Sequence, residues 1–328
     1  MKWIVKTLLV LLVIGTAGWS GLALYHLPLG NAVTRLILTA LFAGASLSTL
    51  LIPRKKRHAL ALYFAFFALV LAFWFELAPS NDRDWQADVA VLPFAEVQGE
   101  QVMIRNIRDF DYRSESDFDI RYYDREFRLS ELTSVDFFSV YWMGEAIAHV
   151  MVSFGFNDRD YVTFSIETRK EQGETYSSLK GFFRNYELIY VVGDERDLIR
   201  LRTNYRSPAE DVYLFRSRIR PEHARLLFID YVKKINELKD RPEWYNTLTD
   251  NCTSNIAGHI DAFQDDLRYS WKILLSGYAA EYAYELGAFD SSRPFSEIKR
   301  LGYINPTARA LSDAGDFSRR IRENVPRP

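Results

Sequence analysis

The stretch AHVMVSFGFNDRDYVTFSIETR, residues 148–169, decides the fold of the larger part of this chain. Apolar residues alternate with others over Ala148–Phe156 and again over Tyr161–Arg169, as they do in β-strands. The polar residues 157–160 between the two runs suit a tight turn. Two such runs joined by a short turn predict an antiparallel hairpin, with His149 on its first strand.

The second strand of this hairpin offers two polar partners for His149. Ser165 and Glu167 are two residues apart, so their side chains point to the same face of the strand. The alternation does not fix the register between the strands, and both partners therefore stay open. We expect Glu167 to be the one that orients the histidine.

A second informative stretch lies further along the chain, where residues 245–260 read YNTLTDNCTSNIAGHI and contain the only cysteine, Cys252. The residues up to Asn251 have side chains that cap helix N-termini, and Ile256 and Ile260 follow at helical spacing. Cys252 is therefore expected in the first turn of a helix, where unpaired backbone N–H groups favour a thiolate. The alternative is a buried, unreactive cysteine.

The bulk composition excludes several classes of function. A formal net charge of −2 over 328 residues gives no electrostatic reason to expect a nucleic-acid partner. One cysteine excludes an intramolecular disulfide and any multi-cysteine zinc site. The sequence also lacks a P-loop, a dinucleotide fingerprint and an H-E-x-x-H motif. It therefore predicts neither a metal nor a cofactor.

The N-terminal quarter is strongly apolar. Uncharged runs lie between Lys6 and Arg35, over 36–53 and over 59–75, each close to the roughly 17–25 residues that span a bilayer as a helix. Basic residues precede the first run and fill the connection at 54–57, which places these parts in the cytoplasm by the positive-inside rule. Three core helices of a soluble protein are the alternative.

These patterns predict an α+β membrane protein with three transmembrane helices and a cytoplasmic N-terminus. The expected parts are a transmembrane anchor over residues 1–79, a linker over 80–100 and an extracytoplasmic domain over 101–328. Further strands are expected over 101–110, 187–192 and 211–215, and helices over 221–238 and 271–286. The segment 129–142 could be a helix or a strand. Residues 319–328 are expected to form a loosely held basic tail.

A cysteine nucleophile needs a base to take its proton and a polar group to orient that base. The domain has three histidines. His223 reads as a solvated residue, and His259 lies two helical turns from Cys252, out of reach of the thiol. The remaining assignment is Cys252 as nucleophile, His149 as base, Glu167 as its partner, and the Cys252 N–H with the Asn251 side chain as oxyanion site.

A helix-borne cysteine with a strand-borne histidine earlier in the chain is the arrangement of circularly permuted papain-like (NlpC-type) domains. The segments HVMVSFGF, FSIETR, NYELIYVVGDERD, LIRLRTNYR and WYNTLTDNCTSNI resemble the Lnb N-terminal periplasmic domain family, from about Val102 to Ile260. This family is named after bacterial lipoprotein N-acyltransferases.

The resemblance implies a thiol-dependent acyltransferase and, together with the predicted spans, a protein of the bacterial inner (cytoplasmic) membrane whose catalytic domain is periplasmic. Its acyl donor would be a phospholipid and its acceptor the N-terminal amine of a lipoprotein, with the acyl group carried as a thioester on Cys252. Two alternatives stay open. One is a cysteine peptidase or amidase of the cell envelope that uses the same residues, and the other is a non-enzymatic envelope scaffold in which Cys252 is a core residue.

Overall fold

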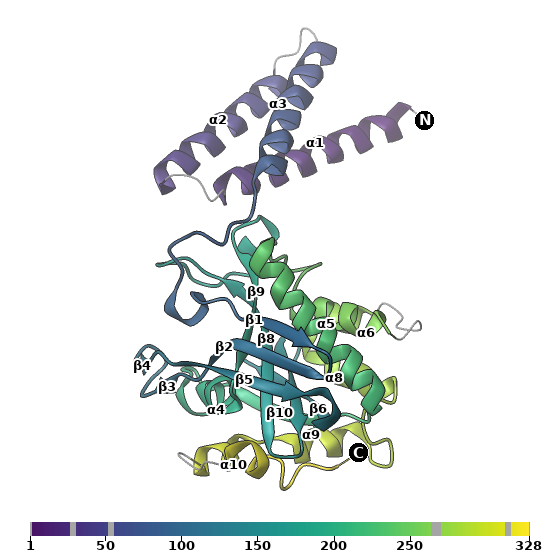
Figure 1. The fold of residues 1–328 in the computed structure, drawn as a ribbon. Coiled ribbons are helices and arrows are strands. Elements are labelled where there is room, and N and C mark those ends of the chain that lie inside the picture. The colour runs from purple at the N-terminus through teal and green to yellow at the C-terminus, as the bar shows by residue number, and fades with distance from the viewer. Residues whose placement is uncertain (1, 27–30, 52–55, 264–269, 312–315, 328) are drawn as a thin grey trace. The chain divides into compact units, whose positions relative to one another are not determined.

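The computed structural model describes residues 2–26, 31–51, 56–263, 270–311 and 316–327, and Figure 1 shows its fold. The chain divides into two compact units. The first contains residues 1–80 together with two short segments from later in the sequence, 175–187 and 244–247, and the second contains the rest.

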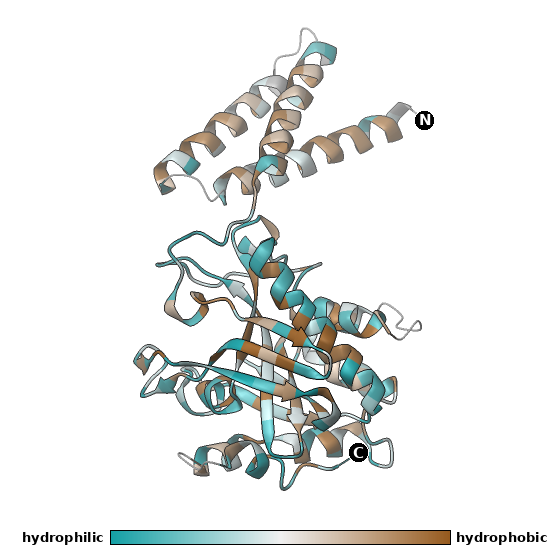
Figure 2. Cartoon of the chain, viewed as in Figure 1, coloured by the Kyte–Doolittle hydropathy of each residue, from teal (hydrophilic) through white to brown (hydrophobic). Residues whose placement is uncertain are grey.

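The first unit is built on three apolar helices, α1 (Lys2–Tyr25), α2 (Ala32–Leu51) and α3 (Lys56–Glu76). Figure 2 shows hydrophobic residues along most of their length. They pack through Val13, Phe42 and Tyr63, whose hydroxyl lies 2.7 Å from Thr16 Oγ1. The stretches Trp3–Tyr25 and Arg57–Glu76 are long and apolar enough to cross a membrane, while that of α2, Ala32–Ser48, is shorter. Of the predicted basic connection, Arg54 and Lys55 lie outside the described residues.

The second unit is built on a mixed sheet. The strand order is β1-β2-β9-β8-β7-β6-β10, and β5 pairs with β2 off this path. The strands are β1 (Phe94–Gln98), β2 (Gln101–Arg108), β5 (Tyr122–Arg128), β6 (Leu132–Tyr141), β7 (Ala148–Phe156), β8 (Asp160–Arg169), β9 (Glu187–Gly193) and β10 (Asp211–Arg216). A separate small pair joins β3 (Asp111–Tyr112) and β4 (Phe118–Asp119).

The hairpin predicted over residues 148–169 is confirmed, since β7 and β8 are antiparallel with Met151 opposite Ser165. The segment 129–142, which the sequence left open as a helix or a strand, contains strand β6, and β6 lies between β7 and β10. The segment 80–100, where we expected a linker, contributes a 3-10 turn at Ala87–Val89 and the edge strand β1.

Helices cover both faces of the sheet (Figure 1). On one face, Phe154 and Phe164 pack against Phe228 of α5 (Pro221–Asp240), and α6 (Cys252–Asp261) contacts both α5 and β7. On the other face, Met151 and Val191 pack in one core with α4 (Glu195–Arg200) and α10 (Asn305–Ala310). Successive side chains of β7 therefore point to opposite faces of the sheet. His149 shares the face of Met151, and Val150 shares the face of Phe154.

The C-terminal segment differs from the loosely held tail that the sequence suggested. Arg322 is buried, and its guanidinium lies 2.7 Å from both Asp136 Oδ2 and Glu195 Oε2. Ile321 and Val325 join the core beside α11 (Phe317–Arg320). The expectation was wrong because buried carboxylates need a cation close by, and the C-terminal segment supplies it.

The helix predicted over 271–286 is interrupted. It is replaced by α7 (Trp271–Leu274), a 3-10 turn at Ser276–Tyr278 and α8 (Ala279–Glu285), which are followed by α9 (Phe295–Gly302). The interruption lets Gly277 N–H donate to Ala146 O at 3.0 Å. A Cβ at this glycine would lie 2.0 Å from Glu145 O, so only glycine permits this approach of two backbones.

Candidate functional site

Cys252 is the first residue of α6, as the sequence predicted, and Asn251 caps the helix. Asn251 Oδ1 accepts from Ser254 N–H at 3.0 Å, and Ser254 Oγ accepts from Asn251 N–H at 2.9 Å. This reciprocal capping box fixes the first turn. Thr253 Oγ1 also donates to Asn251 Oδ1, at 2.8 Å. The amide oxygen of Asn251, which we expected to take part in the oxyanion site through its side chain, is thus used by the cap.

The Cys252 sulfur is buried, with 9% of the residue exposed. Burial raises the pKa of the thiol, the Glu167 charge raises it further, and the backbone N–H groups of Val150, Thr253 and Cys252 lower it. The net shift is upward. The expectation of a thiolate was therefore wrong, because the loss of hydration on burial outweighs the N–H donors of the helix start.

β7 and β8 separate at this end of the sheet. Pairing of β7 with β8 stops at Met151, whereas pairing with β6 continues to Ala148. Val150 therefore lies beyond the last described pair of β7 and β8, and its N–H is one of the groups that lower the pKa of Cys252.

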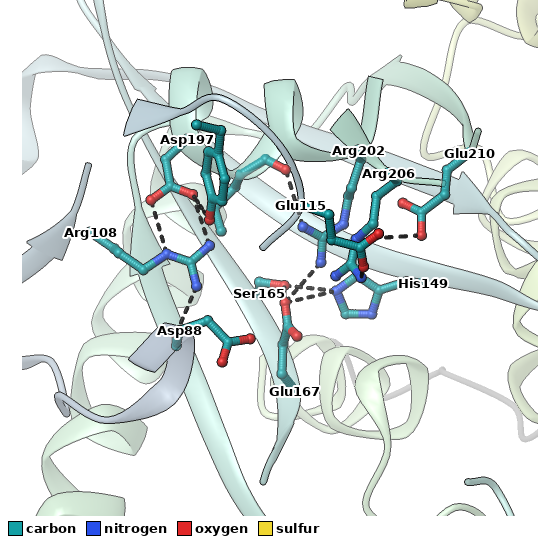
Figure 3. A network of polar contacts seen from close by, with 12 residues as sticks. Asp88, Arg108, Glu115, His149, Ser165, Glu167, Asp197, Arg202, Arg206 and Glu210 are labelled. Atoms are coloured by element: carbon teal, nitrogen blue, oxygen red, sulfur yellow. Dashed lines mark hydrogen bonds and ion pairs between the residues drawn. The ribbon is translucent and has the colours of Figure 1, made fainter. Parts of the chain in front are cut away.

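His149 lies at the same separation, beside both polar residues of β8. Its Nε2 is 2.7 Å from Ser165 Oγ and 3.7 Å from Glu167 Oε1. Ser165 Oγ in turn donates to Glu167 Oε1 at 2.7 Å. Figure 3 shows the three side chains converging. Glu167 thus lies where the sequence placed it, and Ser165 stands between it and the histidine.

The hydrogen bonds fix the tautomer of His149. The carboxylate of Glu167 can only accept, so the single hydroxyl proton of Ser165 points toward it. Ser165 Oγ then accepts from His149 Nε2–H. The unprotonated nitrogen of the neutral ring is therefore Nδ1, and this is the atom that can take up a proton.

Burial keeps His149 neutral near pH 7. Burial lowers the pKa of His149 to about 4, with Arg202 and Arg206 lowering it and Glu167 raising it. Arg202 Nη2 donates to Glu167 Oε1 at 2.8 Å, and together with His149 it holds the pKa of Glu167 well below its usual range despite burial. An ionised Glu167 thus accepts from Ser165 while His149 Nδ1 stays available as a base.

The structure brings His149, Ser165, Glu167 and Cys252 to one end of β7. The negative charge of Glu167 acts on both His149 and Cys252. Within the described parts of the chain, no hydrogen bond joins the His149 ring to the Cys252 sulfur. His149 is two residues from Met151 on β7, so its side chain shares the face that packs on α4, whereas α6 packs on the opposite face.

A mostly apolar cavity of about 470 Å³ reaches Thr253, the residue after Cys252, at the first turn of α6. Its walls come from β7, α5, α6 and α8 and include Val150, Leu227, Thr253, Ile256, Ala280 and Phe289. Val150 and Thr253 belong both to this lining and to the residues whose N–H groups lower the pKa of Cys252. The volume is in the range of small-molecule sites, and the lining suits an aliphatic chain. His223, expected in solvent, also lines the cavity.

His259 was read from the sequence as a helix-face residue, but it is buried in a second network. Its Nδ1 lies 2.7 Å from Asp230 Oδ2, and its Nε2 lies 2.9 Å from the hydroxyl of Tyr190. The ring stacks on Tyr231 with centroids 4.0 Å apart. Cys252, Ile256 and His259 follow helical spacing, and this signal could have identified the buried face of α6.

Comparison with known proteins identifies one family. Residues 119–277 match the family model of the Lnb N-terminal periplasmic domain. The match covers His149, Ser165, Glu167 and Cys252, and it starts and ends later than the resemblance from about Val102 to Ile260. No similar curated protein and no similar solved structure was found.

The family match and the apolar helices both indicate a membrane-anchored protein. An Lnb-like periplasmic domain with membrane-spanning-capable helices indicates an envelope protein that is anchored in a membrane and exposes this domain to the periplasm. Residues 119–277, which contain all the candidate catalytic residues, are thus an Lnb N-terminal periplasmic domain.

Proposed function

We propose that this protein is a cysteine-dependent acyltransferase of the bacterial inner membrane. It moves an acyl chain from a phospholipid, through a thioester on Cys252, to the N-terminal amine of a lipoprotein. The three N-terminal helices anchor it with the N-terminus in the cytoplasm, and residues 101–328 work in the periplasm. The domain follows the circularly permuted papain-like order, with the histidine strand ahead of the cysteine helix.

The observation that carries this proposal is the mostly apolar cavity beside the start of α6. Val150 and Thr253 line this cavity, and their N–H groups lower the pKa of the Cys252 thiol. A chain bound in the cavity would place its carbonyl end near these donors. A peptide substrate has many polar groups, which an apolar cavity of this kind would leave without hydrogen-bond partners.

The first step starts from two neutral groups. As the Cys252 sulfur attacks the ester carbonyl of the phospholipid, its proton passes to His149 Nδ1. The resulting imidazolium is held by Ser165 and Glu167, which strengthens the base at the moment of attack. The N–H groups near the sulfur stabilise the oxyanion. The bond from the carbonyl carbon to the glycerol oxygen then breaks, and that oxygen takes the proton from His149.

The second step discharges the thioester. The amine nitrogen of the acceptor attacks the thioester carbonyl and loses one proton to His149 Nδ1. The carbon–sulfur bond breaks, an amide remains on the acceptor, and the sulfur recovers its proton from His149. Water in place of the amine would release a fatty acid by the same proton transfers. The nature of the acceptor therefore separates a transferase from a lipase.

The direct test is mass spectrometry of the full chain after incubation with phospholipid vesicles. We expect a mass increase of one acyl group on the peptide that contains Cys252. The adduct should disappear when an amine-terminated lipopeptide is added, with one equivalent of acylated lipopeptide formed. The Cys252→Ala variant serves as the control and should carry no adduct.

Two results would overturn the proposal. If the wild-type chain forms no adduct with phospholipid but cleaves a cell-wall peptide, the site is that of a peptidase or amidase. If the Cys252→Ala variant transfers acyl groups as the wild type does, the cysteine is a core residue and the domain does not use thiol chemistry.

A further inference from the structure

Two short segments of the periplasmic sequence pack on the ends of the transmembrane helices. Residues 175–187 and 244–247 belong to the same compact unit as α1–α3, and we call them the collar. Arg184 Nη1 donates to the carbonyl oxygens of Trp74 and Leu77 at 2.8 and 3.2 Å, and its guanidinium carbon lies 3.9 Å from the centroid of the Trp74 ring. The collar is thereby fixed to the C-terminal end of α3.

The collar also meets the end of α1. The Phe183 ring stacks on His26, which directly follows α1, with centroids 5.6 Å apart. Trp244 Nε1 donates to Leu77 O at 3.3 Å. The C-terminal ends of α1 and α3 thus both meet the collar. In a bilayer that these two helices cross, the collar would lie at the depth where they leave the hydrocarbon.

The two collar segments hold each other in place. Thr247 Oγ1 donates to Ser178 O at 2.7 Å, and Thr247 N–H donates to Gly181 O at 3.3 Å. A Cβ at Gly181 would lie 2.2 Å from Thr247 Oγ1, so this contact needs a glycine. The Tyr186 hydroxyl donates to Thr175 O at 2.7 Å. The collar thus has a defined conformation, and so does its outer surface.

That outer surface is apolar and basic. Tyr176, Leu179 and Phe182 are 40%, 46% and 38% exposed, which is unusual for three large hydrophobic residues within seven positions. The collar contains Lys180 and Arg184, and its acidic residue, Glu187, is buried. Aromatic and aliphatic side chains next to basic ones, without exposed acidic residues, are typical of segments that lie in the headgroup region of a bilayer.

We propose that the collar binds the outer leaflet of the membrane at the boundary between headgroups and acyl chains. Tyr176, Leu179 and Phe182 enter the upper part of the acyl region, and Lys180 contacts the phosphates of anionic lipids. The collar ends at Thr247, and only the segment Leu248–Asn251 separates it from Cys252 in the chain. The collar therefore anchors the nucleophile loop to the lipid surface. This inference does not depend on the chemistry of the thiol.

The test uses the full chain in lipid nanodiscs with a single fluorophore. In a Cys252→Ser background, a cysteine is introduced at Leu179 or Phe182 and labelled. A matched control label replaces Leu226, which is 54% exposed on α5. Quenching is measured with aqueous iodide, with nitroxide lipids labelled near the headgroup, and with nitroxide lipids labelled near the chain end.

We expect headgroup-level nitroxide to quench Leu179→Cys and Phe182→Cys several-fold more than it quenches Leu226→Cys, with the reverse order for iodide. Adding Lys180→Glu should reduce lipid quenching at position 179 in anionic nanodiscs but not in neutral ones. Strong quenching by iodide at 179 and 182 would overturn the proposal, because the surface would face water. Weak quenching by iodide and by both lipids would also overturn it, because a protein partner would then cover the collar.

Discussion

Two histidines lie near the ends of the Cys252 helix, and their surroundings differ. His149 lies at an opening between β7 and β8, where it meets a serine, an ionised carboxylate and two arginines. His259 lies in an aromatic layer between α5 and α6, where it meets Asp230, Tyr190 and the ring of Tyr231. Burial lowers the pKa of both.

The difference lies in the ring nitrogens. Both nitrogens of His259 already have partners, Asp230 at Nδ1 and Tyr190 at Nε2, so this ring has no position left for a proton from a substrate. His149 uses Nε2 to bind Ser165 and keeps Nδ1 for another partner. A histidine with one engaged nitrogen is suited to proton transfer, and one with two engaged nitrogens is suited to holding helices together.

The largest expected effect is the difference in acylation rate between variants of the two histidines. His149→Gln should lower the rate of Cys252 acylation by about 10²–10⁴-fold, since it removes the base but keeps a side-chain donor for Ser165. His259→Gln should leave that rate within a few-fold of the wild type. Single-turnover acylation followed by mass spectrometry provides the measurement. Equal losses in the two variants would show that our distinction is wrong.

The next effect concerns the charges that surround only His149. Arg202→Met should destabilise the protein by about 3–5 kcal/mol, because the Glu167 carboxylate would lose its buried cation. The matched control is Arg113→Met, whose partner Asp117 and whose own side chain are 61% and 54% exposed. That variant should change stability by about 0–1 kcal/mol. Thermal unfolding of both variants in the same detergent makes the comparison.

A third effect uses the face of α6 that lines the cavity. Ala257 lines the cavity, and Ala257→Leu should reduce kcat/KM for long-chain donors by about 10–200-fold while short-chain donors are less affected. The control is Gly258→Leu, where an added Cβ would meet no atom within 4 Å. A uniform loss over all chain lengths in Ala257→Leu would mean that the cavity does not hold the acyl chain.

The fourth effect breaks the His259 network. Asp230→Asn should destabilise the domain by about 1–3 kcal/mol, because the neutral amide is a weaker acceptor for His259 Nδ1–H than the carboxylate. The rate of Cys252 acylation should change little. A large loss of rate with unchanged stability would instead assign His259 to the reaction.

The sequence predicted the parts of this comparison that depend on local pattern. Alternation over 148–169 placed His149, Ser165 and Glu167 on paired strands, and capping residues placed Cys252 in the first turn of α6. It did not predict the contacts of His259, because Asp230 and Tyr190 are 29 and 69 residues away. Spacing along one helix does not reveal partners on others.

The wrong expectations about the C-terminal segment and the Cys252 thiol have the same cause. Arg322 pairs with Asp136 and Glu195, which are 186 and 127 residues away in sequence, so its local context suggested a solvated tail. The pKa of Cys252 was misjudged because a helix start predicts N–H donors but not the depth of burial. Desolvation depends on everything that packs around the sulfur, and short sequence windows do not contain that information.

The smallest effect is a shift in pH dependence. The imidazole accepts a proton only while it is neutral, and the pKa of His149 is lowered to about 4. The rate of Cys252 acylation should therefore fall on the acid side near pH 4 and not near the ordinary value of 6.5. Glu167→Gln removes a negative charge that raises this pKa, so its acid limb should lie at still lower pH. His259→Gln should leave the limb in place.

Stability must be followed over the same range, because the folded His149 resists protonation. Its pKa is lower in the folded than in the unfolded chain, so its contribution to stability is fully present above pH 6.5 and is lost as the pH falls toward 4. A fall in acylation rate near pH 6.5 that coincides with unfolding would reflect this loss of stability. A limb near pH 6.5 in a folded protein, or one that moves with His259→Gln, would assign the base to the other histidine.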